Sequence, residues 1–177
     1  RVRRLALAAL LAASAAAASA APDARPLFAR GRIQWAAGGG YGAYGPRDYA
    51  VLALQGDWFL RDGLSAGLSG EAWLGSNPQV YDLSPQVREV FLDAPWAEKP
   101  FVGAFYRRTA FSRGDAPEDS GGARAGVVIP LSARAYASVD LAYERYSRCD
   151  PRLFSRCDLV YPEVAIAFGL GSSGAAR

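Results

Sequence analysis

Histidine is absent from this chain of 177 residues. Its absence excludes Ser-His-Asp and Cys-His nucleophile activation, excludes acid or base catalysis by imidazole, and removes the commonest transition-metal ligand. Cysteine is scarce: the two residues, Cys149 and Cys157, both lie in "YERYSRCDPRLFSRCDLVYP". They stand too far apart for a Cys-x-x-Cys redox motif, and a zinc site there would need Asp150 and Asp158 as further ligands. We therefore predict no catalytic residue, no metal site and no cofactor.

Long apolar runs are also lacking beyond the first residues, because no later segment reaches the roughly 20 apolar residues of a transmembrane helix. The chain opens "RVRRLALAALLAASAAAASAAPDARP". Arginines 1, 3 and 4 precede an apolar stretch that starts at Leu5 and runs to about Ala18, and Ala18-Ser19-Ala20 offers an A-x-A cleavage site. This arrangement is typical of a secretory signal peptide, so we expect residues 1–20 to direct export and to be removed.

The rest of the chain has no excess of positive or negative charge. The whole sequence contains 20 basic and 17 acidic residues. Three of the arginines belong to the expected signal peptide, so its removal leaves the remainder balanced. A nucleic-acid partner therefore has no support from composition.

What the chain does contain is period-two alternation of apolar and polar residues, in runs closed by Gly, Pro, Asp, Asn or Ser. The clearest run is "LSAGLSGEAWL", in which Leu64, Leu68 and Leu74 alternate with Ser65 and Glu71. We predict strands over residues 30–41, 49–60, 64–74, 86–93, 101–111, 123–131, 134–146 and 158–170. The phase of runs 86–93 and 101–111 is ambiguous, since charges occur on both faces; one of Arg107 and Arg108 belongs to the polar face.

The connections between these runs alternate in length, which is a second and independent pattern. Short ones such as "RDG" and "SA" follow the even-numbered runs, and longer ones such as "SRGDAPEDSGG" and "SRCDPRLFSRC" follow odd-numbered runs. An up-and-down meander with tight turns at one end produces this alternation. Strands of about ten residues, even in number and following an export signal, predict an all-β, eight-stranded antiparallel transmembrane barrel.

At this point the sequence resembles the small eight-stranded outer-membrane barrels of Gram-negative bacteria, the superfamily of outer membrane protein A and outer membrane protein X. The resemblance covers residues 30–170 and includes the final strand "YPEVAIAFGL". Such barrels usually end in an aromatic residue that apolar residues precede at alternate positions, and the assembly machinery recognises this signal. Val164, Ile166 and Phe168 fit the signal. The sequence departs from it in that "GLGSSGAAR" follows Phe168.

The resemblance implies a location and partners. We expect a periplasmic lead-in at residues 21–29, an outer-membrane barrel at 30–170 and a tail at 171–177. The implied partners are outer-membrane lipid, periplasmic chaperones and the barrel assembly machinery. An extracellular partner is not identified.

The polar face, if it points inward, collects arginines and carboxylates in comparable numbers. Charges in so narrow a lumen must be paired, and eight strands leave little free bore. We therefore predict a blocked lumen rather than a gated channel. The expected ion-pair network consists of Arg32, Glu71, Arg88, Arg124, Asp140, Glu144 and Glu163.

The superfamily is functionally mixed, and no motif here indicates one activity. We predict a non-enzymatic scaffold that presents extracellular loops, because the lipid-modifying enzymes of this shape depend on a catalytic histidine. The alternatives are a soluble exported lipocalin-like barrel with an apolar interior, a small pore, and a lipid-modifying enzyme.

The two cysteines then fall in the last extracellular loop, in an oxidising compartment where a disulfide is the default. We predict a Cys149–Cys157 bridge at the base of the loop. Leu153 and Phe154 at its tip are the candidate contacts with an outside partner.

Overall fold

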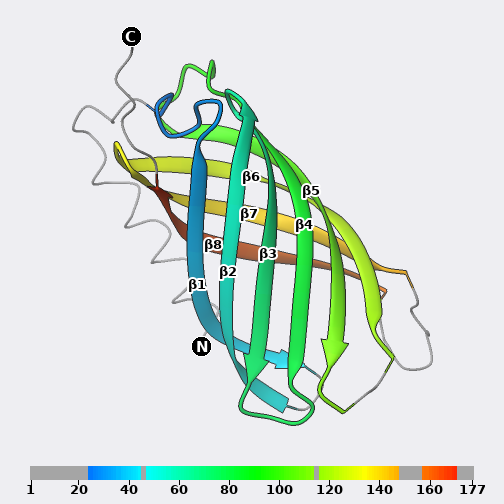
Figure 1. The fold of residues 1–177 in the computed structure, drawn as a ribbon. Helices are drawn as coiled ribbons and strands as arrows, with labels where there is room; N and C mark the ends of the chain where they lie inside the picture. The colour runs from blue at the N-terminus through cyan, green and yellow to red at the C-terminus, as the bar shows by residue number, and fades with distance from the viewer. Residues whose placement is uncertain (1–23, 45–46, 114–115, 148–156, 171–177) are drawn as a thin grey trace, which may run out of the picture.

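The computed structural model describes residues 24–44, 47–113, 116–147 and 157–170. These ranges contain eight strands that follow one another around a closed antiparallel barrel (Figure 1). The strands are β1 (Ile33–Tyr44), β2 (Arg47–Arg61), β3 (Leu64–Leu74), β4 (Val80–Val90), β5 (Lys99–Phe111), β6 (Glu118–Ser132), β7 (Ala135–Tyr146) and β8 (Asp158–Leu170). The predicted fold class is confirmed. No helix in the described ranges is long and apolar enough to cross a membrane.

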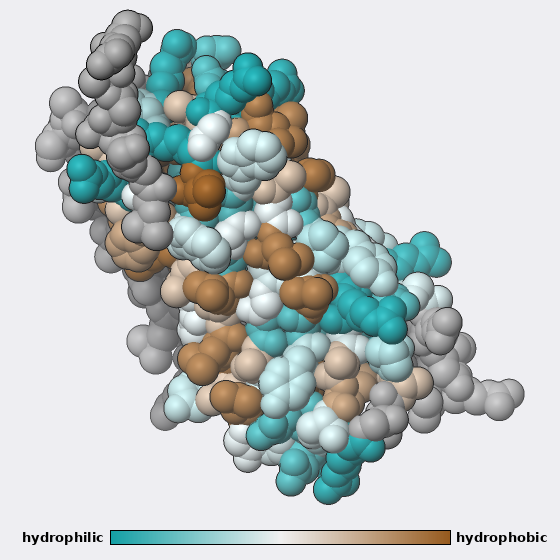
Figure 2. All heavy atoms as spheres, in the orientation of Figure 1, coloured by the Kyte–Doolittle hydropathy of each residue, from teal (hydrophilic) through white to brown (hydrophobic). Residues whose placement is uncertain are grey.

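Alternation along the strands separates two surfaces of opposite character. On β7, Ser138, Asp140 and Glu144 are buried inside the barrel, while Leu141 and Tyr143 are 60% and 43% exposed on the outside. Figure 2 shows apolar side chains across the middle of the visible face and hydrophilic ones gathered toward its upper and lower ends. The barrel is therefore apolar outside and largely polar inside.

The predicted strand boundaries fail most clearly at β4. The sequence pattern predicts a strand over 86–93, but β4 spans Val80–Val90. Pro85 lies within it, and the pairing of β4 with β5 skips from Leu83 to Gln86. Proline has no backbone donor and normally argues against a paired strand. Here its side chain faces outward, and its neighbours Ser84 and Gln86 face inward.

The start of β6 was also predicted too late. This strand begins at Glu118 rather than at residue 123. The added residues read "EDSGG", a polar and glycine-rich stretch that resembles a loop when only propensity is considered. They join the sheet because they pair with residues 105–109 of β5.

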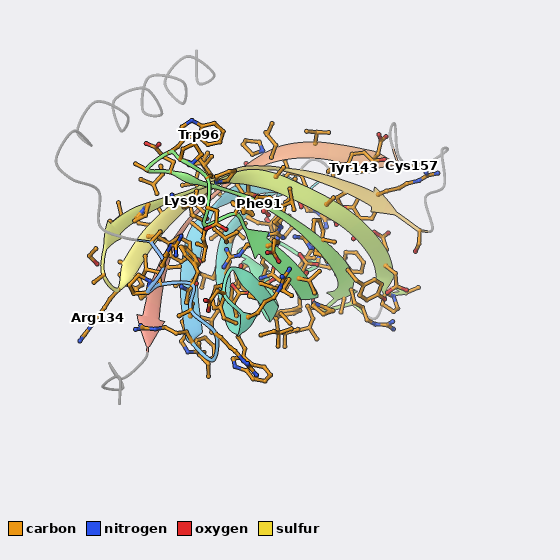
Figure 3. All side chains as sticks on the ribbon, turned by 90° about the horizontal axis from the view of Figure 1, so that it is seen from above. Phe91, Trp96, Lys99, Arg134, Tyr143 and Cys157 are labelled. Carbon is orange, nitrogen blue, oxygen red and sulfur yellow. The ribbon has the colours of Figure 1, made fainter. Side chains whose placement is uncertain are left out.

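Residues 24–32 correct the expected lead-in. The prediction placed 21–29 outside the barrel, but Leu27 and Phe28 are 0% exposed and Ala24 is 2% exposed. This segment folds back and enters the end of the barrel where the connections 62–63, 91–98 and 133–134 also lie. We call this the closed end. The opposite end, which holds the connection 75–79 and residues 112–113 and 116–117, is the open end. Arg134 and Cys157 lie at these opposite ends (Figure 3).

Several predictions fall outside the described residues. They include the signal peptide at 1–20, the tail at 171–177, Cys149, Leu153 and Phe154. The disulfide and the loop contacts therefore remain predictions. The predicted assembly signal is described, and its residues Val164, Ile166 and Phe168 are 66%, 47% and 54% exposed on the outer face of β8.

Candidate functional site: the lumen and its floor

An apolar layer closes one end of the lumen. The Phe28 ring lies 5.6 Å from the Phe59 ring and 5.1 Å from the Tyr136 ring, measured between centroids. We call this layer the floor; it consists of Ala24, Leu27, Phe28, Ala36, Phe59, Val90, Phe101, Val128, Tyr136 and Ala167. The hydrophobic effect favours the burial of these apolar side chains, which here lie inside the end of a barrel instead of in a globular core.

Hydrogen bonds hold the inserted segment in place. Gln34 Nε2 donates to the carbonyl of Leu27 over 2.6 Å, and the Gly63 amide donates to the carbonyl of Phe28 over 2.9 Å. Gly63 has a positive φ of 83°, and a Cβ there would stand 2.5 Å from the Val90 carbonyl oxygen. The tight turn between β2 and β3 therefore requires glycine, and it also anchors the floor.

The first buried ion pair lies just above the floor. An Arg88 nitrogen stands 3.1 Å from Asp57 Oδ2, and the same nitrogen donates to the Tyr136 hydroxyl over 2.8 Å. Gln86 Nε2 donates to Asp57 Oδ1 over 3.0 Å, and Gln55 Nε2 donates to Asp57 Oδ2 over 2.5 Å. The Asp57 carboxylate thus has partners on both oxygens, as a buried charge needs.

Arg107 forms the second ion-pair centre. Its nitrogens lie 3.1 Å from Glu144 Oε2 and 3.7 Å from Glu71 Oε1. Glu144, which is 1% exposed, also accepts hydrogen bonds from the Ser120 hydroxyl at 2.5 Å and the Tyr161 hydroxyl at 2.7 Å. Five strands, β3 and β5 to β8, thus supply side chains to one polar cluster that crosses the barrel.

The third ion pair leaves one carboxylate without a full set of partners. Arg124 lies 3.2 Å from Glu163 Oε2 and stacks over Phe105, with its guanidinium carbon 4.9 Å from the ring centroid. Asp140 faces Glu163 across the β7–β8 ladder and is 6% exposed. Its Oδ2 atom is buried and has no hydrogen-bond partner.

Five of the seven residues expected in the lumen network form ion pairs: Glu71, Arg88, Arg124, Glu144 and Glu163. Asp140 lies among them without an ion pair. Arg32 precedes β1 at the closed end, and no ion pair joins it to another described residue.

The predicted ion-pair network omitted Asp57 and did not decide between Arg107 and Arg108. Asp57 shares its alternation phase with Gln55, so that phase could have identified it. Arg107 could not be separated from Arg108, because its strand carries charges on both faces. The structure points Arg107 inward and Arg108 outward, where the Arg108 side chain is 56% exposed.

The lumen charges do not balance as expected. In the described part of the chain the lumen cluster contains three guanidinium groups, from Arg88, Arg107 and Arg124, and six carboxyl groups. The carboxyl groups belong to Asp57, Glu71, Asp82, Asp140, Glu144 and Glu163. The interior is therefore acidic.

The ion pairs leave part of the lumen unfilled. A cavity of about 600 Å³ remains above the floor. Its polar lining includes Glu71, Arg88, Arg107, Asp140 and Glu144, and Trp73 also contacts it. The expectation that charged side chains alone fill the barrel is too simple, because the apolar floor closes one end and open volume remains above it.

Comparison with known proteins supports the fold. No family model matches this chain, and no curated protein matches it. Among solved structures it is similar to the N-terminal β-barrel domain of Pseudomonas aeruginosa OprF, with 14% identity over 80% of this chain and 98% of that one and a TM-score of 0.55. It also aligns with Neisserial surface protein A, with 12% identity over 78% and 93% of the two chains and a TM-score of 0.49. The chain therefore shares the β-barrel fold of the OprF domain.

Proposed function

We propose that this chain is an exported, non-conducting barrel of the bacterial outer membrane that acts as a scaffold for its open-end loops. One observation carries the proposal: large apolar side chains cover much of the outer face of the strands, whereas charged side chains are buried in the lumen. Examples are Leu52, Leu68, Val102 and Leu141, which are 46–60% exposed. Such an outer surface is costly in water and favourable in lipid.

Aromatic residues at the closed end support the same location. Phe91 and Trp96 are 46% and 63% exposed beside the connection between β4 and β5. Lys99 Nζ orders this connection by donating to the carbonyls of Ala94 at 2.7 Å and Trp96 at 2.8 Å (Figure 3). Aromatic side chains favour the membrane–water interface.

The polarity argues against a soluble lipocalin-like barrel. That alternative needs an apolar cavity and a hydrated outer wall. Here the cavity is lined by Glu71, Arg107 and Glu144, while Leu68 and Leu141 are 50% and 60% exposed on the outer wall.

Two features support a lumen that does not conduct ions. The floor closes one end with apolar rings, and ion pairs cross the barrel above it. A hydrated path would have to pass both layers. If the barrel acts as a scaffold, any binding specificity lies in the loops, because loop sequences can change without disturbing a rigid barrel.

Cell fractionation tests this proposal. The full chain, expressed in a Gram-negative host, is expected in the outer-membrane fraction and to need detergent for extraction. Unboiled protein should migrate differently from boiled protein in gel electrophoresis, because the closed barrel resists unfolding. Recovery of the folded chain in the soluble periplasm would refute the membrane location.

A charge on the outer wall provides a prediction at the level of one residue. Leu141→Arg places a guanidinium near the middle of β7 and is expected to lower the free energy of unfolding in lipid by about 2–4 kcal/mol. Leu131→Arg, near the closed end of β6, is the matched control and should cost about 0–1 kcal/mol. Equal effects of the two substitutions in urea titrations of vesicle-embedded protein would contradict a lipid-facing wall.

The cysteine pair provides a prediction about the last loop. If Cys149 and Cys157 are bridged after export, an alkylating reagent should add no mass to the unfolded, unreduced protein and should modify two thiols after reduction. Modification before reduction would contradict the bridge. If the loop serves a partner, replacing Leu153 and Phe154 should abolish that binding while heat-modifiable migration is kept.

A further inference from the structure

The barrel closes along only part of the seam between its first and last strands. Residues Ile33–Ala37 of β1 pair with Ile166–Leu170 of β8. The remainder of β1, to Tyr44, and of β8, from Asp158, forms no pair across this seam among the described residues, although both stretches pair fully on their other sides. Figure 1 shows the two strands meeting near the C-terminal end of β8 and diverging from there.

An open seam matters in a membrane, because unpaired backbone N–H and C=O groups are not tolerated against hydrocarbon unless they line a water-filled cavity or are covered. The lumen cavity meets this condition. Its lining includes Gly38 and Gly39 from β1 and Val160, Pro162 and Val164 from β8, in addition to the lumen charges. The cavity is therefore continuous with the lateral opening.

The charged end of this cavity has four carboxyl groups, from Glu71, Asp140, Glu144 and Glu163, and three guanidinium groups. The three lumen guanidiniums are already engaged, each by at least one carboxylate at 3.1–3.2 Å. Asp140 contributes a carboxylate that is 94% buried, lines the cavity and has an unpartnered Oδ2 atom, since its exposed fraction is 6%. Asp140 faces Glu163 across the β7–β8 ladder, and two adjacent carboxylates repel each other; a cation bound beside them removes that repulsion.

The lateral end of the cavity has the opposite chemistry. Gly38 leaves space beside the strand, and Leu159, Val160 and Val164 provide apolar contacts. The floor blocks access from the closed end. A volume of about 600 Å³ lies within the range typical of sites for small organic ligands.

We propose that this site binds a single-chain amphiphile with a cationic head group, which enters from the membrane through the β1–β8 seam. The head group lies near Asp140 and the alkyl chain lies along the seam glycines. The inference rests on the proposed membrane location.

Fluorescence quenching in phosphatidylcholine vesicles tests the site. A chain with Trp35, Trp58 and Trp96 replaced by Phe retains Trp73, which lines the cavity, as its single tryptophan. The probe is a dodecyltrimethylammonium brominated in its alkyl chain, and the comparison compound has the same chain with a sulfonate head. The cationic probe should quench Trp73 saturably, at a concentration at least about tenfold lower than the sulfonate.

Three further variants in this background locate the binding. Asp140→Asn should lower the affinity for the cationic probe by about tenfold and leave the affinity for the sulfonate unchanged. Asp93→Asn is the matched control, because the Asp93 side chain is 95% exposed at the closed end. This variant should bind the cationic probe with the same affinity as the parent protein. Gly38→Leu should reduce quenching by filling the passage, and it is compatible with folding since a Cβ there meets only Ala53 Cβ at 3.9 Å.

The outcomes separate this inference from the proposed function. Failure of the chain to insert into vesicles and to show heat-modifiable migration would overturn both. Insertion followed by equal quenching with both head groups, or parental affinity in Asp140→Asn, would overturn the cationic site alone.

Discussion

Replacing Arg107 with methionine is expected to lower the free energy of unfolding by about 3–5 kcal/mol, because it leaves the buried Glu144 carboxylate without its cation. Arg107 also lies 3.7 Å from Glu71 and donates to the Ser84 hydroxyl over 3.2 Å, so several contacts are lost together. The measurement is urea-induced unfolding in lipid, followed by tryptophan fluorescence and by the loss of the heat-modifiable band.

The adjacent arginine is the matched control for this prediction. Arg108 points outward, lies 3.4 Å from Asp119, and its side chain is 56% exposed. Its replacement by methionine should change stability by about 1 kcal/mol or less, as for other exposed ion pairs. Adding Glu144→Gln to Arg107→Met should recover part of the loss, since it removes the uncompensated charge. If both single arginine variants lost the same stability, the inward orientation of Arg107 would be refuted.

Replacing Phe28 with alanine is expected to cost about 3–5 kcal/mol, the range for removing a fully buried aromatic side chain. The ring is 0% exposed and contacts Phe59 and Tyr136 in the floor. This result is informative because Phe28 belongs to a segment that precedes every strand of the barrel. Wild-type stability in this variant would show that residues 24–32 do not occupy the lumen.

Phe91→Ala provides a size-matched comparison at the same end of the barrel. Phe91 is 46% exposed, so its removal should cost less than about 1.5 kcal/mol. A second measurement addresses conduction directly. Wild-type protein is expected to show no steady current in planar bilayers, and the double variant Leu27→Ala/Phe28→Ala should show intermittent openings. A steady current through the wild-type protein would contradict the proposed seal.

Local pattern was sufficient where both faces of a strand were chemically distinct. The run 64–74 matches β3 residue for residue, and 158–170 matches β8. In β3 apolar or small residues occupy every second position from Leu64 to Leu74, and in β8 apolar residues do so from Val160 to Leu170. Side chains on opposite sides of a strand experience different surroundings, so such alternation specifies strand and phase together.

Pattern failed where pairing with a neighbour overrides local preference. Pro85 and the glycines of "EDSGG" disfavour strands individually. Pro85 nevertheless lies in β4, where β3 pairs with it on one side, and the two glycines lie in β6, where β5 and β7 pair with them on both sides. The choice between Arg107 and Arg108 has the same origin. Both belong to one strand, and only the register around the closed barrel decides which guanidinium faces the lumen.

The sequence by itself therefore determined the class of fold, the number of strands and the polarity of most of their faces, since these follow from a two-residue period that needs no long-range information. Only the tertiary structure decided that Leu27 and Phe28 form a floor, that Asp57 pairs with Arg88, and that β1 and β8 leave part of their seam open. Each of these features joins residues far apart in the chain. Their contacts depend on how the strands tilt and close in space, and periodicity along the chain does not encode that geometry.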